Sequence, residues 1–206
     1  MSGNASVTCC PRIRRQRKKH RILREIRAVP TGTALLAQDE TDVLLLPVLR
    51  AGWALRGQPA QVPISGKNAR RTVFGALNLR TGHLLCLDQK RKRALEFQEF
   101  LDFVRGHYRA RPVALLLDEN SAHQSQESQS LAEDLDIQLL WLPKRSPHLN
   151  PVDRLWGKGK DAACANLQQS IDVQVDQFIG YYQDLSPAER LRKAGLFSPT
   201  FWLYKI

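Results

Sequence analysis

The second half of the chain alternates between nearly continuous apolar runs and segments in which apolar residues recur every three or four positions. Val113–Leu117 and Ile137–Leu142 are the apolar runs, and they predict strands covered on both faces of a sheet. Ala94–Tyr108 has helical spacing with acids between its apolar residues, and helices are also predicted over Ser125–Leu135 and Pro151–Asn166. Strands that alternate with helices favour parallel neighbours in a sheet.

The first half of the chain has a different organisation. Thr33–Asp39 is a short apolar run that ends in an acid, which predicts a strand with Asp39 at its C-terminal end. Thr72–Leu79 and His83–Leu87 predict two more strands, joined by a hairpin turn at residues 80–82. Strands joined in this way are antiparallel neighbours.

Two further helices are predicted near the C-terminal end, over Ile171–Leu185 and Pro187–Ala194. The order of elements therefore predicts an α/β domain in which helices pack against a mixed five-stranded sheet. A chain of 206 residues with 43% hydrophobic content is long enough to bury the core of one such domain. We assign this domain to residues 29–206.

Positive charge is concentrated at the N-terminal end. The formal net charge is +11, and the first 27 residues hold nine lysines and arginines against a single acid, Glu25. We interpret residues 1–28 as a flexible basic arm. Such an arm favours a polyanionic partner, because contacts with phosphates release condensed counterions. A solubilising tail, the remnant of a larger chain and an organelle transit peptide are the alternatives.

The cysteines and the apolar runs exclude several classes of protein. Cys9 and Cys10 are adjacent, while Cys86 and Cys164 stand alone, so the spacing fits neither a zinc site nor a disulfide framework. No run reaches the roughly 18 apolar residues of a membrane span, and the N-terminus has no apolar core for a secretory signal. We therefore expect a soluble protein of the reducing cytoplasm, without a membrane partner.

Three aspartates lie where predicted strands and helices begin or end. Asp39 and Asp118 each close a predicted strand, and Asp153 lies in the first turn of a predicted helix. Hard ions such as Mg²⁺ are bound by a few carboxylates together with water and phosphate oxygens. Two such ions, about 3.5–4 Å apart, can stabilise both the attacking and the leaving oxygen of a phosphodiester. The three acids therefore favour a divalent-metal site for phosphodiester chemistry.

Other interpretations of these acids remain open. Glu40 or Asp42 is an alternative ligand to Asp39, and Asp118 could merely cap the turn that follows it, with Glu119 as a competing acid. For the third aspartate the alternative is helix capping. Asn-Pro-Val-Asp at residues 150–153 places an N-cap, a first-turn proline and an acid that favours the helix dipole, without any catalysis.

The run LPKRSPHLNPVDRLW, from Leu142 to Trp156, resembles the signature of mariner-like bacterial insertion-sequence transposases of the DDE superfamily, approximately L-P-x-x-S-P-x-L-N-P-I-E-x-x-W. In that family the second acid opens a D-N-x-x-x-H pattern, and here His123 follows Asp118 at the matching distance. The 34 residues between Asp118 and Asp153 also match the family. Asp39-Glu40, followed by Gly52-Trp53 and Gly57, resembles the first-acid segment, so the resemblance covers about residues 24–202.

This resemblance implies a ribonuclease H-like fold, in which acids from the first strand, the fourth strand and a late helix meet. Asp39, Asp118 and Asp153 would then bind Mg²⁺ or Mn²⁺, as a pair of ions, and catalyse hydrolysis at a transposon end followed by strand transfer into target DNA. Further candidates, supporting the ligands or contacting DNA, are Asn120, His123, Lys144, Arg145 and Arg154, although a structural histidine and a solvated basic face are alternatives.

The resemblance also implies partners: transposon-end and target DNA, a second copy of the chain in a homodimer, and a helix-turn-helix module. The basic arm is too short to hold that module, so we expect the catalytic half of a split or frameshifted element, with a possible separate helix-turn-helix polypeptide, or a truncated copy. Two departures are Asp153 in place of the commoner Glu, and Glu119 in place of Asn. Competing functions are a catalytically incompetent remnant that binds only DNA or subunits, and a ribonuclease H-like nuclease or resolvase.

Overall fold

The computed structural model describes residues 11–46, 49–59, 61–62, 64, 66–144, 146–164 and 169–204. Its secondary-structure elements follow closely the boundaries predicted from the sequence between residues 70 and 193. In chain order they are α1 (Pro11–Ala28), β1 (Ala34–Leu44), β2 (Arg70–Asn78), β3 (Leu84–Gln89), α2 (Ala94–His107), β4 (Val113–Leu117), α3 (Gln126–Asp134), β5 (Ile137–Trp141), the short 3₁₀ helix η1 (Pro147–Leu149), α4 (Pro151–Ala163), α5 (Ile171–Gln183) and α6 (Pro187–Lys193).

The strands form one mixed sheet in the order β3-β2-β1-β4-β5. β1 pairs antiparallel with β2, and β2 pairs antiparallel with β3, while β4 is parallel to both β1 and β5. The predicted mixed five-stranded sheet is therefore confirmed. As a result β1, β3, β4 and β5 all point the same way, and their C-terminal ends lie at one end of the sheet.

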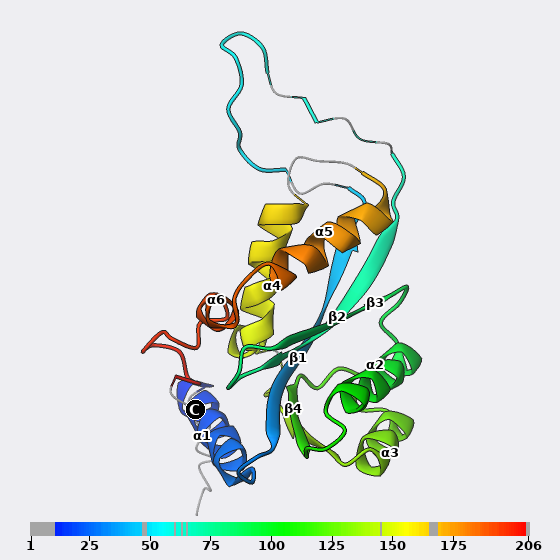
Figure 1. The fold of residues 1–206 in the computed structure, drawn as a ribbon. Coiled ribbons are helices and arrows are strands. Elements are labelled where there is room, and N and C mark those ends of the chain that lie inside the picture. Colours follow the sequence, from blue (N-terminus) through cyan, green and yellow to red (C-terminus); the bar gives the residue numbers. More distant parts are fainter. Residues whose placement is uncertain are drawn as a thin grey trace, which may run out of the picture.

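Helices cover both faces of this sheet (Figure 1). One face carries α1, α4, α5 and α6, and the other carries α2 and α3. Because side chains alternate along a strand, Leu35 and Ala37 of β1 belong to the first core, whereas Ala34 and Leu36 belong to the second. The position of a residue in β1 therefore decides which layer of helices it faces.

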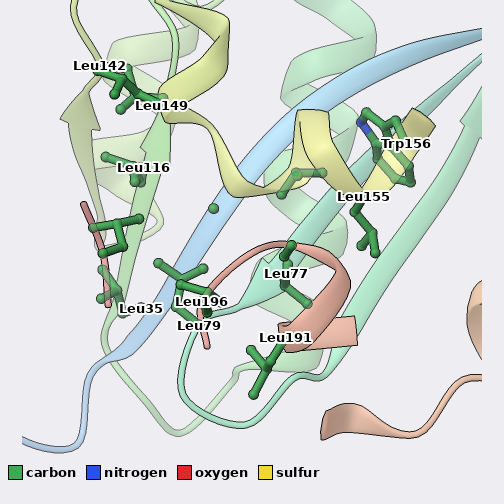
Figure 2. Close-up of a cluster of buried hydrophobic side chains, with 14 of the residues drawn as sticks. Leu35, Leu77, Leu79, Leu116, Leu142, Leu149, Leu155, Trp156, Leu191 and Leu196 are labelled. Atoms are coloured by element: carbon green, nitrogen blue, oxygen red, sulfur yellow. The ribbon is translucent and has the colours of Figure 1, made fainter. Parts of the chain in front are cut away.

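The core on the α4 face fixes that helix to the sheet. Figure 2 shows Leu155 and Trp156 of α4 beside the strand residue Leu77, and Leu149, which precedes the helix, beside Leu142. Leu155 is fully buried and Trp156 is 3% exposed. Fully burying such side chains contributes about 1.5–3 kcal/mol each, so the N-terminal half of α4 is held firmly in place.

The prediction that Asp39 ends its strand is wrong. β1 continues for five residues, to Leu44, because Thr41 and Val43 are buried and the whole segment pairs with β2. Only the pairing with β4 stops early, at Ala37, opposite Leu116. Asp39 therefore lies inside a long strand, but just beyond the point where its parallel neighbour leaves it.

The strand β5 is an edge strand of the sheet, and the predicted cover on both of its faces is confirmed, because α1 packs on one face and α3 on the other. Its Gln138 is exposed, whereas Ile137 and Leu140 are buried. An edge strand of an α/β sheet needs less apolar cover than a central strand, and β4, which is buried throughout, lies inside the sheet.

Helix α1 is a feature that we did not predict within the basic N-terminal segment. Its Ile22 and Ile26, four residues apart, are buried in the core on the α4 face. The density of lysine and arginine hides this short apolar stripe in the sequence. Residues 1–10 lie outside the described residues, and the division of the chain at residue 28 stays a prediction. None of the helices in the described ranges is long and apolar enough to span a membrane.

Candidate active site

Asp39 on β1 and Asp118, the residue directly after β4, occupy equivalent positions relative to the pairing of these two strands. The last residues paired between β1 and β4 are Ala37 and Leu116, and Asp39 and Asp118 follow these two residues by two positions each. Because strand side chains alternate with a period of two, both carboxylates continue the face of Ala37 and Leu116. That is the face covered by α4.

Asp153 comes to the same place on α4. Asn150 is the N-cap of this helix, since its Oδ1 accepts a hydrogen bond from the Val152 N–H at 3.1 Å, and Pro151 occupies the first turn. The predicted helix start is therefore confirmed, together with the capping role that competes with catalysis. The helix begins beside the end of the β1–β4 pairing and brings Asp153, in its first turn, to the two strand aspartates.

The three aspartates line one pocket of about 360 Å³. Its walls come from the end of β4, the segment between β5 and η1, and the start of α4. The lining residues are Asp39, Asp118, Glu119, Leu142, Lys144, Ser146, Pro147, Asn150 and Asp153. Residues separated by more than a hundred positions in the sequence thus gather their carboxylates in one cavity.

The carboxyl of Asp39 has a strongly shifted pKa. Burial raises the pKa of its carboxyl well above the ordinary value, and the negative charges of Glu40, Asp153 and Asp118 raise the pKa further. The contributions of Asp153 and Asp118 show that the three carboxylates interact across the pocket. Such mutual repulsion is relieved when a cation binds between carboxylates.

Asp118 is held by a buried histidine. Nδ1 of His123 lies 3.0 Å from Asp118 Oδ1, and its Nε2 lies 2.6 Å from Glu40 Oε1 on β1. Burial by itself lowers the pKa of His123, but the hydrogen bonds to Asp118 and Glu40 outweigh it and raise the pKa to about 10. The hydrogen bond from His123 in turn lowers the pKa of Asp118. His123 therefore links the two strands as a charged imidazolium, with both ring nitrogens donating.

The competing acids near Asp39 are engaged elsewhere. Glu40 points to the opposite face of β1, where it accepts hydrogen bonds from His123 and, at 2.6 Å, from Gln38. Asp42 accepts a hydrogen bond from Thr72 at 2.8 Å and pairs with Lys92 at 3.0 Å. Neither lines the pocket. Glu119 does line it, next to Asp118, and its carboxylate lies 3.4 Å from Lys144.

Of the remaining predicted residues, some line the pocket and others make contacts outside it. Lys144 lines the pocket, and its side chain is 67% exposed. Asn120 accepts a hydrogen bond from the Ala122 N–H and so stabilises the turn after Asp118. Arg154 does not line the pocket, because its guanidinium stacks over the ring of Phe201 at 4.4 Å. Arg145 lies outside the described residues.

The donor set of the pocket fits a hard divalent cation. Three carboxylates in one pocket are the ligands that Mg²⁺ and Mn²⁺ prefer. Within the described residues, however, no three histidine, cysteine, aspartate or glutamate side chains are grouped so as to hold an ion. The carboxylate of Asp118 instead bonds to His123, and it is 55% exposed.

Sequence reasoning missed the contacts that fix α4 over the pocket. A Cβ atom on Gly75 of β2 would lie 2.4 Å from the ring of Trp156, and one on Gly159 would lie 2.0 Å from the hydroxyl of Tyr182. Both glycines therefore allow a close approach that any side chain would block. Glycines inside a predicted strand and a predicted helix were the signal in the sequence, since they often mark such approaches, although Gly157 in the same helix marks none.

The fold is a mixed five-stranded sheet covered by helices, and its pocket gathers three aspartates from two neighbouring strand ends and the start of a helix. The sequence matches the DDE superfamily endonucleases over residues 34–174, and the chain belongs to this family. It is 32% identical over 149 residues to an insertion element IS630 uncharacterized 39 kDa protein of Shigella sonnei, a match that covers 71% of the chain and 43% of that protein.

The fold is also that of the Mos1 transposase. The Mos1 paired-end complex with the left transposon end matches with a TM-score of 0.70 at 16% identity. A mariner Mos1 paired-end complex with Mg matches with a TM-score of 0.70 at 17% identity, and both matches cover 98% of this chain and 64% of the Mos1 chain. The predicted ribonuclease H-like fold and the resemblance to mariner-like transposases are therefore confirmed. The chain spans less than two thirds of the length of these relatives.

Proposed function

We propose that this chain cleaves DNA and transfers DNA strands in a transposition reaction that depends on Mg²⁺ or Mn²⁺. The observation that supports this function best is the convergence of Asp39, Asp118 and Asp153, from two strands and a helix, on one pocket. The family supports it as well. Two ions bound by these carboxylates would neutralise charge on the attacking and leaving oxygens of the phosphodiester.

The candidate residues have three proposed roles: binding the metal ions, contacting DNA and stabilising the site. The three aspartates hold the ions, and His123 restrains Asp118 through the 3.0 Å contact with its carboxylate. Lys144 is an exposed cation that lines the pocket, 3.4 Å from the carboxylate of Glu119, and we assign it to a DNA phosphate. Arg145 shares this assignment by its position in the sequence. Asn120 and Arg154 support the site only through the turn and the helix that they stabilise.

The DNA partners follow from the relatives. The Mos1 transposase forms a paired-end complex with a transposon end. By analogy we propose that this chain acts on transposon ends and target DNA as a homodimer. End recognition would come from a helix-turn-helix module, in this protein or in a separate polypeptide. The positive charge of residues 1–28 suits the same polyanion.

A catalytically incompetent DNA-binding or subunit-binding regulator is the second candidate function. The observation in its favour is that the carboxylate of Asp118 is bonded to His123. Such a protein would keep the fold and the charge of the family but would not cleave.

Nicking of supercoiled plasmid by the purified protein, with Mg²⁺, Mn²⁺ or no metal, tests the proposal. We expect metal-dependent nicking that Asp118→Asn abolishes while the circular dichroism spectrum is retained. The matched control is Asp102→Asn, an exposed aspartate on α2 away from the pocket, which should nick like the unmodified protein. Nicking by Asp118→Asn at the unmodified rate would refute the assignment of that residue, and plasmid binding without nicking under either metal would favour the regulator.

A further inference from the structure

Asn150 makes one more hydrogen bond than its capping role requires. Its Oδ1 accepts from the Val152 N–H at 3.1 Å, as in any N-cap, while its Nδ2 donates to the backbone carbonyl of Gln38 at 2.7 Å. The side chain is buried, at 3% exposure. One residue therefore binds both the first turn of α4 and the backbone of β1, immediately before Asp39.

The bond to Gln38 lies where β1 and β4 separate. The carbonyl of Leu35 accepts from Leu79 on the β2 side, and the N–H of Ala34 donates to Pro112 on the β4 side, so the even-numbered backbone groups of β1 face β4. The carbonyl of Gln38 thus points toward β4 one residue after the strand pairing ends. Asn150 supplies a donor there in place of a strand amide, between the two aspartate-bearing strands.

The segment that carries Asn150 is itself rigid. Its own N–H donates to the Pro147 carbonyl at 2.7 Å, and the preceding carbonyl, of Leu149, accepts from the indole N–H of Trp202 at 2.8 Å. The side-chain amide is therefore presented to β1 from a turn that is fixed on both sides. A movement of α4 relative to β1 has to break the bond between Asn150 and Gln38.

We propose that Asn150 is a positioning residue that sets the separation of Asp153 from Asp39 and so the affinity of the pocket for the divalent ion. This inference rests on the proposed function. Three other helices show that capping alone does not need an asparagine: α3, α5 and α6 are capped by Ser125, Ser170 and Ser186. Asparagine adds the amide donor, which serine lacks.

The test compares Asn150→Ser and Asn150→Asp with the unmodified protein in Mn²⁺ titrations followed by electron paramagnetic resonance, alongside plasmid nicking. Both variants keep a capping oxygen and lose the donor to Gln38, and thermal melts establish the temperature at which each is folded. Residues that orient metal ligands typically change metal affinity by about 10–100-fold, so we expect Asn150→Ser to bind Mn²⁺ about tenfold or more weakly. Asn150→Asp is nearly isosteric and reports on packing and the cap, but it adds a carboxylate to the pocket beside Asp39, Asp118 and Asp153, so the comparison of metal affinity rests on Asn150→Ser.

Ser170→Ala is the matched control. It removes the N-cap of α5, where Ser170 accepts from the Val173 N–H. It should lower the free energy of unfolding by an amount similar to that in the Asn150 variants, without changing Mn²⁺ affinity. Unmodified Mn²⁺ affinity and nicking in folded Asn150→Ser would overturn the positioning role and leave an ordinary helix cap. Absence of Mn²⁺ binding in the unmodified protein would instead refute the metal site, and this role with it.

Discussion

The hydroxyl of Tyr182 on α5 lies against the backbone of Gly159 on α4. It accepts a hydrogen bond from the Gly159 N–H at 3.0 Å and donates one to the Leu155 carbonyl at 2.9 Å. In an uninterrupted helix these two backbone groups bond to each other, because they are four residues apart. Tyr182 therefore enters the hydrogen-bond ladder of the helix that carries Asp153, and it is only 1% exposed there.

Gly159→Ala should destabilise the protein, although alanine favours helices more than glycine does. The added Cβ would lie 2.0 Å from the Tyr182 hydroxyl, inside the packed contact between α4 and α5. Overpacking of this kind costs about 1–3 kcal/mol. Gly157→Ala, two residues away on the exposed side of the same helix, meets nothing within 4 Å and should be neutral or stabilising by up to about 1 kcal/mol. Urea unfolding of both variants measures the difference, and equal effects would show that Tyr182 does not confine α4.

Gly75→Ala should push α4 away from the sheet. Its Cβ would meet the Trp156 ring at 2.4 Å, and a strand backbone has little freedom to retreat. We expect a loss of about 1–3 kcal/mol in the free energy of unfolding. Trp156→Phe makes room, so the double variant should lose less than the sum of the single losses, with a coupling of at least about 0.5 kcal/mol. Strict additivity in a double-mutant cycle would mean that position 75 and the ring of Trp156 are not in close contact.

His123→Gln should be strongly destabilising. It removes the imidazolium from between Asp118 and Glu40, and it leaves the Glu40 carboxylate, 8% exposed, without its charged partner. Breaking one side of a buried ion pair costs about 3–5 kcal/mol. Adding Glu40→Gln removes the stranded charge and should recover part of the loss in urea unfolding. A double variant that is less stable than either single variant would contradict this description of the pair.

The described cysteines should be unreactive in the native protein. Desolvation raises the pKa of the Cys86 thiol to about 12, and it also raises the pKa of the buried Cys164. Since the thiolate is the reactive form, a chromogenic disulfide reagent at about pH 8 should label neither residue until urea unfolds the chain. Cys9 and Cys10, outside the described residues, are replaced by serine for this measurement. Rapid labelling before unfolding would show that one of the two thiols is accessible and ionisable.

Most of the fold could be predicted because local patterns are strong where the chain is buried. β4 has the predicted bounds, Val113–Leu117, since a continuous apolar run is typical of a central strand that helices cover on both faces. The extension of β1 beyond Asp39 could not be predicted in the same way. Its acids are typical of a loop, and pairing with β2 overrides that local preference. Helix α1 was missed because Ile22 and Ile26 find their apolar partners only in the folded core.

The three aspartates of the candidate site could be predicted from the sequence, but the contacts that hold them in place could not. Motif and topology indicated Asp39, Asp118 and Asp153, and the structure places all three around one pocket. Sequence could not distinguish Asp39 from Glu40, because the choice depends on which face of β1 each occupies. The bond between Asn150 and Gln38 joins residues 112 positions apart, and no local pattern contains it.

The most direct test of the metal site is a crystal structure of the protein grown with Mn²⁺, with anomalous diffraction data to locate the metal. We predict a manganese peak in the pocket, with carboxylate oxygens of Asp39, Asp118 and Asp153 at coordinating distance and the contact between Asp118 and His123 retained or replaced by metal ligation. A protein saturated with Mn²⁺ that shows no peak between these three aspartates, or shows one bound elsewhere, would contradict the central claim that they form a single metal site.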